Sequence, residues 1–162
     1  MKILNNNNKT YVEEEKSFFY LQYEPIDINY YYEKVLDEVC GAASMFSGTT
    51  RNYFQEKNVI KLEYEAYNEM VFEQLKIIEQ EIRNKWHIEK IVFVHRLGEV
   101  KVTESSVFIA ISSRHRGDSL ESVNYAINKL KEIVPIWKKE HYIDGSSWKE
   151  NKEFLDLLEK NK

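Results

Sequence analysis

The chain has 162 residues, of which 43% are hydrophobic and 14% aromatic. This is enough apolar material for one well-packed core but not for two, so we expect a single domain. The formal net charge of -4 argues against non-specific binding of nucleic acid or anionic membrane surfaces as the main role.

The sequence also bounds location and redox chemistry. No apolar run approaches the roughly 20 residues that span a bilayer, and the Asn-rich start lacks the apolar stretch of a secretory signal, so we expect a cytoplasmic protein. Cys40 is the only cysteine, which leaves no intrachain disulfide, cysteine zinc cluster or Cys-x-x-Cys pair. We expect neither a metal ion nor a cofactor.

The first sixteen residues are rich in Asn, Glu and Lys, and we expect them to form a mobile tail. The catalytic domain should then cover residues 17–151, with residues 152–162 as a C-terminal tail. Residues 18–23 have the pattern of a strand, and Asp27 can cap a short helix that runs to about residue 37. A strand near residues 39–46 and a polar loop through residue 58 should follow.

The hydrophobic period then changes along the chain. Residues 59–67 alternate apolar and polar side chains, which predicts a strand whose buried face carries Ile60, Leu62, Tyr64 and Ala66. An apolar residue every three or four positions next predicts a long amphipathic helix, with the stripe Val71, Leu75, Ile78, Ile82 and Trp86. Residues 91–97 and 106–112 are two further apolar strands.

The last helix is defined by Leu120, Val123, Ile127, Leu130 and Val134. Pro135 ends it, because the residue before a proline is pushed away from helical geometry. Residues 136–142 and 147–151 flank Asp144-Gly145, a strong hairpin signal. Because strands and helices do not alternate regularly, we expect an α+β fold with a mostly antiparallel or mixed sheet.

Cationic side chains gather at two turns that flank this last helix, which points to an anion site in an acidic chain. They are Arg114, His115, Arg116, Lys131, Lys138 and Lys139. His115 and Arg116 come immediately before the predicted helix start, where backbone N–H groups and the helix dipole favour a phosphate or carboxylate.

Lys131 lies beside the apolar stripe of the helix, and two readings are about even. Its stem can lie along apolar surface with the ammonium in water. Alternatively, the ammonium is held in a pocket where it stabilises a developing oxyanion or forms an acyl bond. Lys138 would share a helix face with Lys131 in an unbroken helix, but Pro135 breaks that face.

Two other places carry candidate residues. Arg51 follows the small-residue run 47–50, where a loop lets a guanidinium approach a planar anion. His95 and Arg96 we expect to be strand residues that pair with Glu99 or another acid.

Several catalytic motifs are missing: G-x-S-x-G, G-x-x-x-x-G-K-[ST], His-Glu-x-x-His and G-x-G-x-x-G. The cationic cluster also has no evident nucleophile or carboxylate pair. We infer a site that binds an anionic substrate and stabilises charge while another molecule brings the reactive atom.

Residues 41–151 resemble the large, catalytic subunit of molybdopterin synthase. The resemblance is carried by F-S-G-T-T-R (46–51), L-E-Y-E-A-Y (62–67), V-H-R-L-G-E-V (94–100), S-S-R-H-R (112–116), K-E-I-V-P-I-W-K-K-E (131–140) and D-G-S-S-W-K-E-N (144–151). It implies an α/β hammerhead fold with an additional antiparallel β subdomain. Arg114 departs from the family's pattern, in which a small residue or proline is common at this place.

The resemblance also implies a function, sulfur transfer in molybdenum cofactor biosynthesis. Members of the family convert cyclic pyranopterin monophosphate into molybdopterin by installing a dithiolene, with sulfur from the C-terminal Gly-Gly thiocarboxylate of a small ubiquitin-like subunit. Lys131 and Lys138 match the two active-site lysines, and Arg51, His115 and Arg116 match anion-pocket residues. A homodimer with one small subunit at each end, a heterotetramer, is implied.

Two other classes stay open on the sequence. A non-catalytic module could bind a phosphorylated metabolite through Arg51, His115 and Arg116 without needing Lys131. An interaction protein could use the tyrosine-rich residues 30–32 and the C-terminal hairpin to dock a partner.

Overall fold

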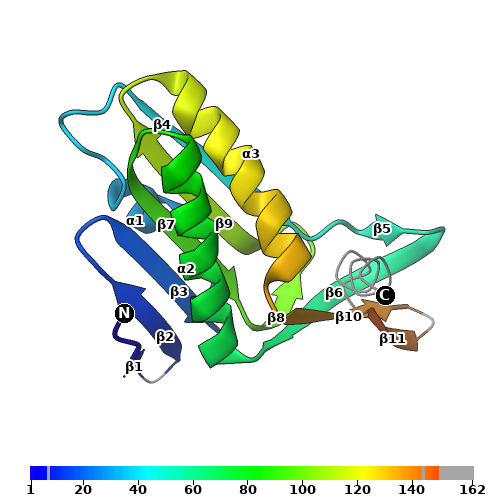
Figure 1. Ribbon diagram of the computed structural model, residues 1–162. Helices are drawn as coiled ribbons and strands as arrows, with labels where there is room; N and C mark the ends of the chain where they lie inside the picture. Colours follow the sequence, from blue (N-terminus) through cyan, green and yellow to red (C-terminus); the bar gives the residue numbers. More distant parts are fainter. Residues whose placement is uncertain (7, 144, 150–162) are drawn as a thin grey trace, which may run out of the picture.

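A computed structural model describes residues 1–6, 8–143 and 145–149, as two sheets and three helices (Figure 1). In chain order the elements are β1 (Leu4–Asn6), β2 (Lys9–Glu13), β3 (Ser17–Gln22), α1 (Ile28–Glu33), β4 (Ala42–Thr49), β5 (Tyr53–Phe54), β6 (Lys57–Ala66), α2 (Asn68–Lys85), β7 (Ile88–Arg96), β8 (Gly98–Lys101), β9 (Ser105–Ser113), α3 (Arg116–Ile133), β10 (Ile136–Tyr142) and β11 (Gly145–Lys149).

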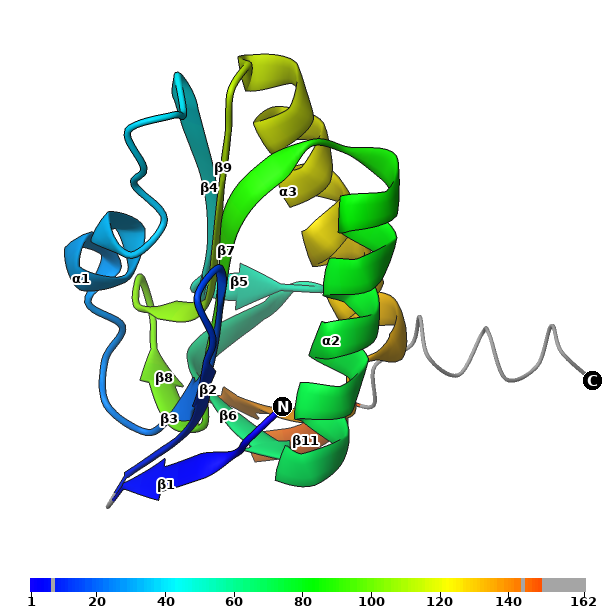
Figure 2. The same cartoon turned by 60° about the vertical axis from the view of Figure 1, so that its left-hand side comes forward.

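The larger sheet has the order β1-β2-β3-β7-β9-β4. Strands β3 and β7 pair in parallel, and all other neighbouring strands in this sheet pair antiparallel. Helices α2 and α3 cover one face and α1 covers the other (Figure 2). The central strands are therefore buried on both faces, which explains the continuous apolar runs of β7 and β9 in place of an alternation.

Successive residues of these strands supply two separate cores. In β7, Ile91 and Phe93 pack with α2 and α3, whereas Val92 and Val94 pack with Tyr31 of α1 and its neighbour Val35. Asp27 caps α1 as predicted, since its side chain accepts a hydrogen bond from the Tyr30 backbone N–H at 3.1 Å. The helix itself ends earlier than expected, at Glu33.

The smaller sheet is antiparallel, with the order β11-β10-β6-β5 and β8 paired to β6. It lies at the C-terminal end of α3 (Figure 1). The α+β class is confirmed, and this sheet corresponds to the antiparallel subdomain that the resemblance implies. The predicted hairpin forms between β10 and β11; Asp144 and residues 150–162, with the predicted C-terminal tail, lie outside the described residues.

The expectation of an N-terminal tail over residues 1–16 is wrong. Strand β2 pairs with β3 along its whole length, Val12 is 1% exposed in the main core, and the Tyr11 ring stacks on Tyr20. A strand with one face open to solvent needs only one buried residue in two, and its polar face resembles a tail in composition.

The alternation in β6 also misleads. Ile60, expected on the buried face, is 51% exposed, whereas Val59 is buried with Leu62 and Tyr142. The pairing with β10 skips Ile60, because Lys61 lies opposite His141 and Val59 opposite Tyr142. This β-bulge moves the residues before it to the other face.

Smaller corrections concern element boundaries and faces. Strand β4 begins at Ala42, three residues later than expected, and the predicted polar loop contains β5. In α3 the stripe holds except at Leu120, which is 58% exposed. Within the parts that the structure describes, no helix combines the length and apolarity needed to cross a membrane.

Candidate active site

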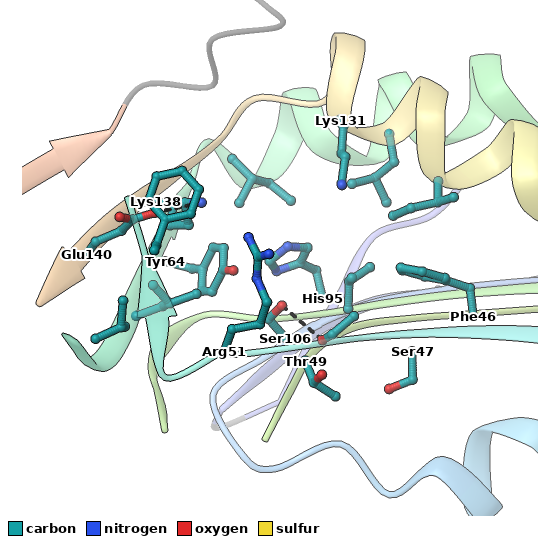
Figure 3. A pocket seen from close by; sticks show the side chains of 18 residues that line it. Phe46, Ser47, Thr49, Arg51, Tyr64, His95, Ser106, Lys131, Lys138 and Glu140 are labelled. Atoms are coloured by element: carbon teal, nitrogen blue, oxygen red, sulfur yellow. Dashed lines mark hydrogen bonds and ion pairs between the residues drawn. The ribbon is translucent and has the colours of Figure 1, made fainter. Parts of the chain in front are cut away.

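A cavity of about 720 Å³ lies where the two sheets and the end of α3 meet. Its walls come from β4, β6, β7, β9, α3 and β10 and from the segment after β4. Figure 3 shows Lys131 extending from α3 into this space, with Arg51, Tyr64 and His95 on the opposite side. The site is therefore built by segments that are far apart in the sequence.

Lys131 lies in the last turn of α3, five residues before β10 begins at Ile136. The helix ends at Ile133, and Val134 is an extended C-cap whose backbone N–H bonds to Leu130 O at 3.1 Å. Lys131 is exposed yet lines the cavity together with Ile127 and Leu130. Its stem borders the apolar stripe while its charge faces the space that a ligand would fill.

Lys138 reaches the same cavity from β10. Pro135 turns the chain between the two lysines, and Ile136, Lys138 and Glu140 then face the cavity at alternate positions of the strand. Lys138 Nζ lies 3.1 Å from Glu140 Oε1. Glu140 is 2% exposed and also accepts a hydrogen bond from the Tyr142 hydroxyl. This buried carboxylate therefore holds the position of the Lys138 ammonium.

Tyr64 and His95 form the wall beside Lys138. Tyr64 lies directly opposite Lys138 in the β6–β10 pair, and burial, with a smaller effect of the Glu140 charge, raises the pKa of its hydroxyl. The His95 ring makes an edge contact with the Tyr64 ring at 5.0 Å. Burial lowers the pKa of His95 to about 4, so its imidazole is neutral at physiological pH.

Arg51 enters the cavity from the segment after β4. Its guanidinium lies 5.7 Å from the centre of the Phe54 ring, a distance at which cation and aromatic face attract. The small-residue run before it is needed for packing at Gly48, where a Cβ would come within 2.6 Å of Val107 Cγ1. Three cationic side chains thus meet one carboxylate in the cavity, which suits an anionic ligand.

The structure does not bring His115 and Arg116 into this cavity. His115 is the extended N-cap of α3 and Arg116 is its first residue, and both are exposed, as is Arg114. Fifteen residues separate Arg116 from Lys131, about 22 Å along the helix axis. Lys139 does not line the cavity either, because it alternates with Lys138 and Glu140 along β10.

Sequence reasoning missed three side chains in the cavity: Tyr64, His95 and Glu140. Glu140 had a usable signal, since it follows Lys138 by two residues in a predicted strand and must share its face. Arg96 pairs with an acid as expected, Glu104, at 2.8 Å. His95 does not, and Glu99 pairs with Lys61 instead.

An α+β fold with a cavity between two sheets that Lys131, Lys138 and Arg51 line is suited to an anionic ligand, and comparison with known proteins identifies the family. The family model described as MoaE protein matches residues 21–133. The molybdopterin synthase catalytic subunit of Taeniopygia guttata is 52% identical over 139 residues, which cover 85% of this chain and 90% of that protein.

Solved structures agree. The crystal structure of molybdopterin synthase from Staphylococcus aureus matches with a TM-score of 0.78 and 38% identity, covering 86% of this chain and 99% of that one. A complex of subunits 1 and 2 of molybdopterin-converting factor from Helicobacter pylori matches in fold, with a TM-score of 0.68 and 20% identity over 80% of this chain and 88% of that one. The chain belongs to the MoaE family, which confirms the resemblance found in its motifs.

Proposed function

We propose that this protein is the catalytic subunit of a molybdopterin synthase, a sulfurtransferase of molybdenum cofactor biosynthesis. It would transfer sulfur from the C-terminal thiocarboxylate of a small ubiquitin-like subunit to cyclic pyranopterin monophosphate. The observation that carries the proposal is the convergence of Lys131, Lys138 and Arg51 on one cavity in a member of this family.

The proposed chemistry needs positive charge at two places. The donor's sulfur bonds to a side-chain carbon of the pterin as a carbon–oxygen bond at that carbon breaks and the oxygen departs as an anion or as water. Water then adds to the donor's acyl carbon as its carbon–sulfur bond breaks, so the donor tail ends as a carboxylate. Lys131 would neutralise the charge that develops on the acyl oxygen, because preorganised cations stabilise such charge without reorganisation. Lys138, oriented by Glu140, would lie beside the pterin, and Arg51 would bind an anionic group of the substrate.

His115 and Arg116 need a different arrangement, since they lie at the far end of α3 from Lys131. We propose that the chain forms a homodimer, with one small subunit per protomer, in which these two residues serve the partner's cavity. Exposed cations at a helix N-terminus are suited to bind the substrate phosphate there. Their replacement by alanine should then weaken pterin binding more than small-subunit binding.

The direct test is incubation with the thiocarboxylated small subunit and cyclic pyranopterin monophosphate, followed by detection of the dithiolene product. Formation of the dithiolene with two thiocarboxylated small subunits consumed per pterin supports the proposal. A module that only binds a phosphorylated metabolite would take up the pterin, release no dithiolene and be indifferent to Lys131→Ala.

A further inference from the structure

The buried side chain of His95 lines the cavity, but the proposed sulfur transfer gives it no role. His95 is 7% exposed and is the only imidazole among the described residues that line the cavity. Its backbone is fixed on both sides, because β7 pairs at this position with Leu21 of β3 and Val107 of β9. The ring is therefore carried by a strand that is paired on both sides within the larger sheet.

The ring's tautomer follows from its contacts. His95 Nδ1 lies 2.9 Å from the backbone oxygen of Arg96. A carbonyl oxygen can only accept, so Nδ1 carries the hydrogen and donates it. The neutral ring then has its lone pair on Nε2, and within the described residues no protein donor bonds to that nitrogen.

The lone pair on His95 Nε2 differs in kind from the charged groups that line the cavity around it. Lys131, Lys138 and Arg51 can only donate hydrogen bonds. The Glu140 carboxylate is held by Lys138 and Tyr142, and the Ser106 hydroxyl donates to the Gly48 carbonyl at 3.3 Å. The cavity thus combines a cationic region for anions with a buried neutral acceptor for an N–H or O–H group.

We infer that His95 Nε2 accepts a hydrogen bond from a ring N–H of the pterin and thereby selects the substrate by its nitrogen heterocycle. The inference rests on the proposed function and extends it to the uncharged part of the same ligand. A fully ionised phosphate or thiocarboxylate group offers no donor for this acceptor, whereas a reduced pterin carries several N–H groups. A buried acceptor also rejects a ligand that leaves it unpaired, because that costs the full desolvation of the group.

Three proteins test the inference by calorimetric titration: His95→Phe, which keeps the ring's volume without an acceptor, His95→Gln, whose amide oxygen can take the place of Nε2, and wild type. His95→Phe should bind cyclic pyranopterin monophosphate about tenfold or more weakly, while His95→Gln keeps most of the affinity. Inorganic phosphate and the small subunit should bind all three alike. His87→Phe, at an exposed position, is the control.

A second measurement does not depend on the variants. In wild-type protein with ¹⁵N-labelled histidine, the Nε2 resonance of His95 should be that of an unprotonated nitrogen and should shift when the pterin is added. Equal pterin affinity of His95→Phe and wild type, or an Nε2 resonance that the pterin leaves unchanged, overturns the inference while leaving the proposed function intact. A wild-type protein that does not bind the pterin at all refutes the proposed function and the inference with it.

Discussion

At the scale of single residues, the cavity is organised by neighbours two positions apart in a strand or directly opposite on the next one. Glu140 is two residues from both Lys138 and Tyr142 and contacts each of them, and Tyr64 faces Lys138 across the β6–β10 pair. The strand period places these side chains on one face. Lys138 is therefore oriented by a buried carboxylate and is not an isolated surface charge.

Lys131→Ala should remove most sulfur transfer while the protein stays folded. Preorganised charge stabilisation is worth roughly 3–4 kcal/mol of barrier, or about two to three decades in rate, and truncation of an exposed side chain costs little stability. Lys131→Arg should rescue poorly, because a planar fork does not replace a compact point charge. Single-turnover product formation and thermal melts are the measurements.

The matched control is Lys129→Ala in the same helix, a lysine that pairs with Glu132 and does not line the cavity. If Lys131→Ala and this control turn over sulfur equally fast, Lys131 is only a surface residue of α3 and the proposed mechanism is wrong.

The buried His95 also predicts a pH dependence of stability. Its pKa is about 4 in the folded protein and about 6.5 in an unfolded chain, so the unfolded state binds more protons between these values and stability falls as pH falls. From pH 7 to pH 5 the loss from this residue should be about 2 kcal/mol. His95→Gln should lack this component.

Urea denaturation of wild type and His95→Gln at both pH values measures the difference, and the carboxylates whose pKa values are lowered, such as Glu79, are common to both proteins. The exposed His87→Gln serves as a control that should keep the wild-type slope. Parallel losses in wild type and His95→Gln would mean that His95 is not held neutral by burial.

At the scale of elements, the hydrophobic period predicts most of the structure. Helix α2 and strands β7 and β9 lie where it places them, because each buries its apolar residues against several neighbours. The errors fall where the period is weak or interrupted, at the N-terminal strands before Ser17 and at the bulge at Ile60. A bulge depends on the partner strand, so a single segment carries no sign of it.

Val12→Ala tests whether the N-terminal strands belong to the fold. Val12 is 1% exposed in the main core, and removal of its buried methyl groups should lower the free energy of unfolding by about 2 kcal/mol. Glu15→Ala, at an exposed position of the same segment, should stay within about 0.5 kcal/mol of wild type. If chemical denaturation finds the two variants equally stable, residues 1–16 do not contribute to the core and form a tail after all.

At the scale of the whole molecule, one cavity brings together three of the five site residues that the sequence predicts. Lys131, Lys138 and Arg51 converge as expected from the resemblance, because Pro135 turns the chain back toward the cavity. His115 and Arg116 lie at the N-terminal end of α3 and Lys131 lies in its last turn. Because the helix has 18 residues, its two ends are far apart in space. Sequence proximity to a helix gives no information about which end of it a ligand meets.

We expect a homodimer in solution that takes up one small subunit per protomer, which light scattering with and without that subunit can measure. If His115 and Arg116 serve the partner's cavity, chains with Lys131→Ala and chains with Arg116→Ala are each inactive alone. A mixed population assembled by co-expression should regain about a quarter of wild-type activity, since half the dimers are mixed and each has one intact site. No recovery would place both residues outside the partner's site, and a strictly monomeric protein would count against the dimer.

The pairing of β3 with β7 has a consequence for how the protein is made. These parallel neighbours are separated by α1, β4, two strands of the smaller sheet and α2. The smaller sheet is itself assembled from stretches before and after the last strands of the larger one. Such non-local pairings are slow to form, because a long loop must close before any contact is gained. During synthesis Arg51, Tyr64 and His95 emerge well before Lys131 and Lys138, so a nascent chain holds an acceptor and an arginine long before it can present the two lysines to a sulfur donor.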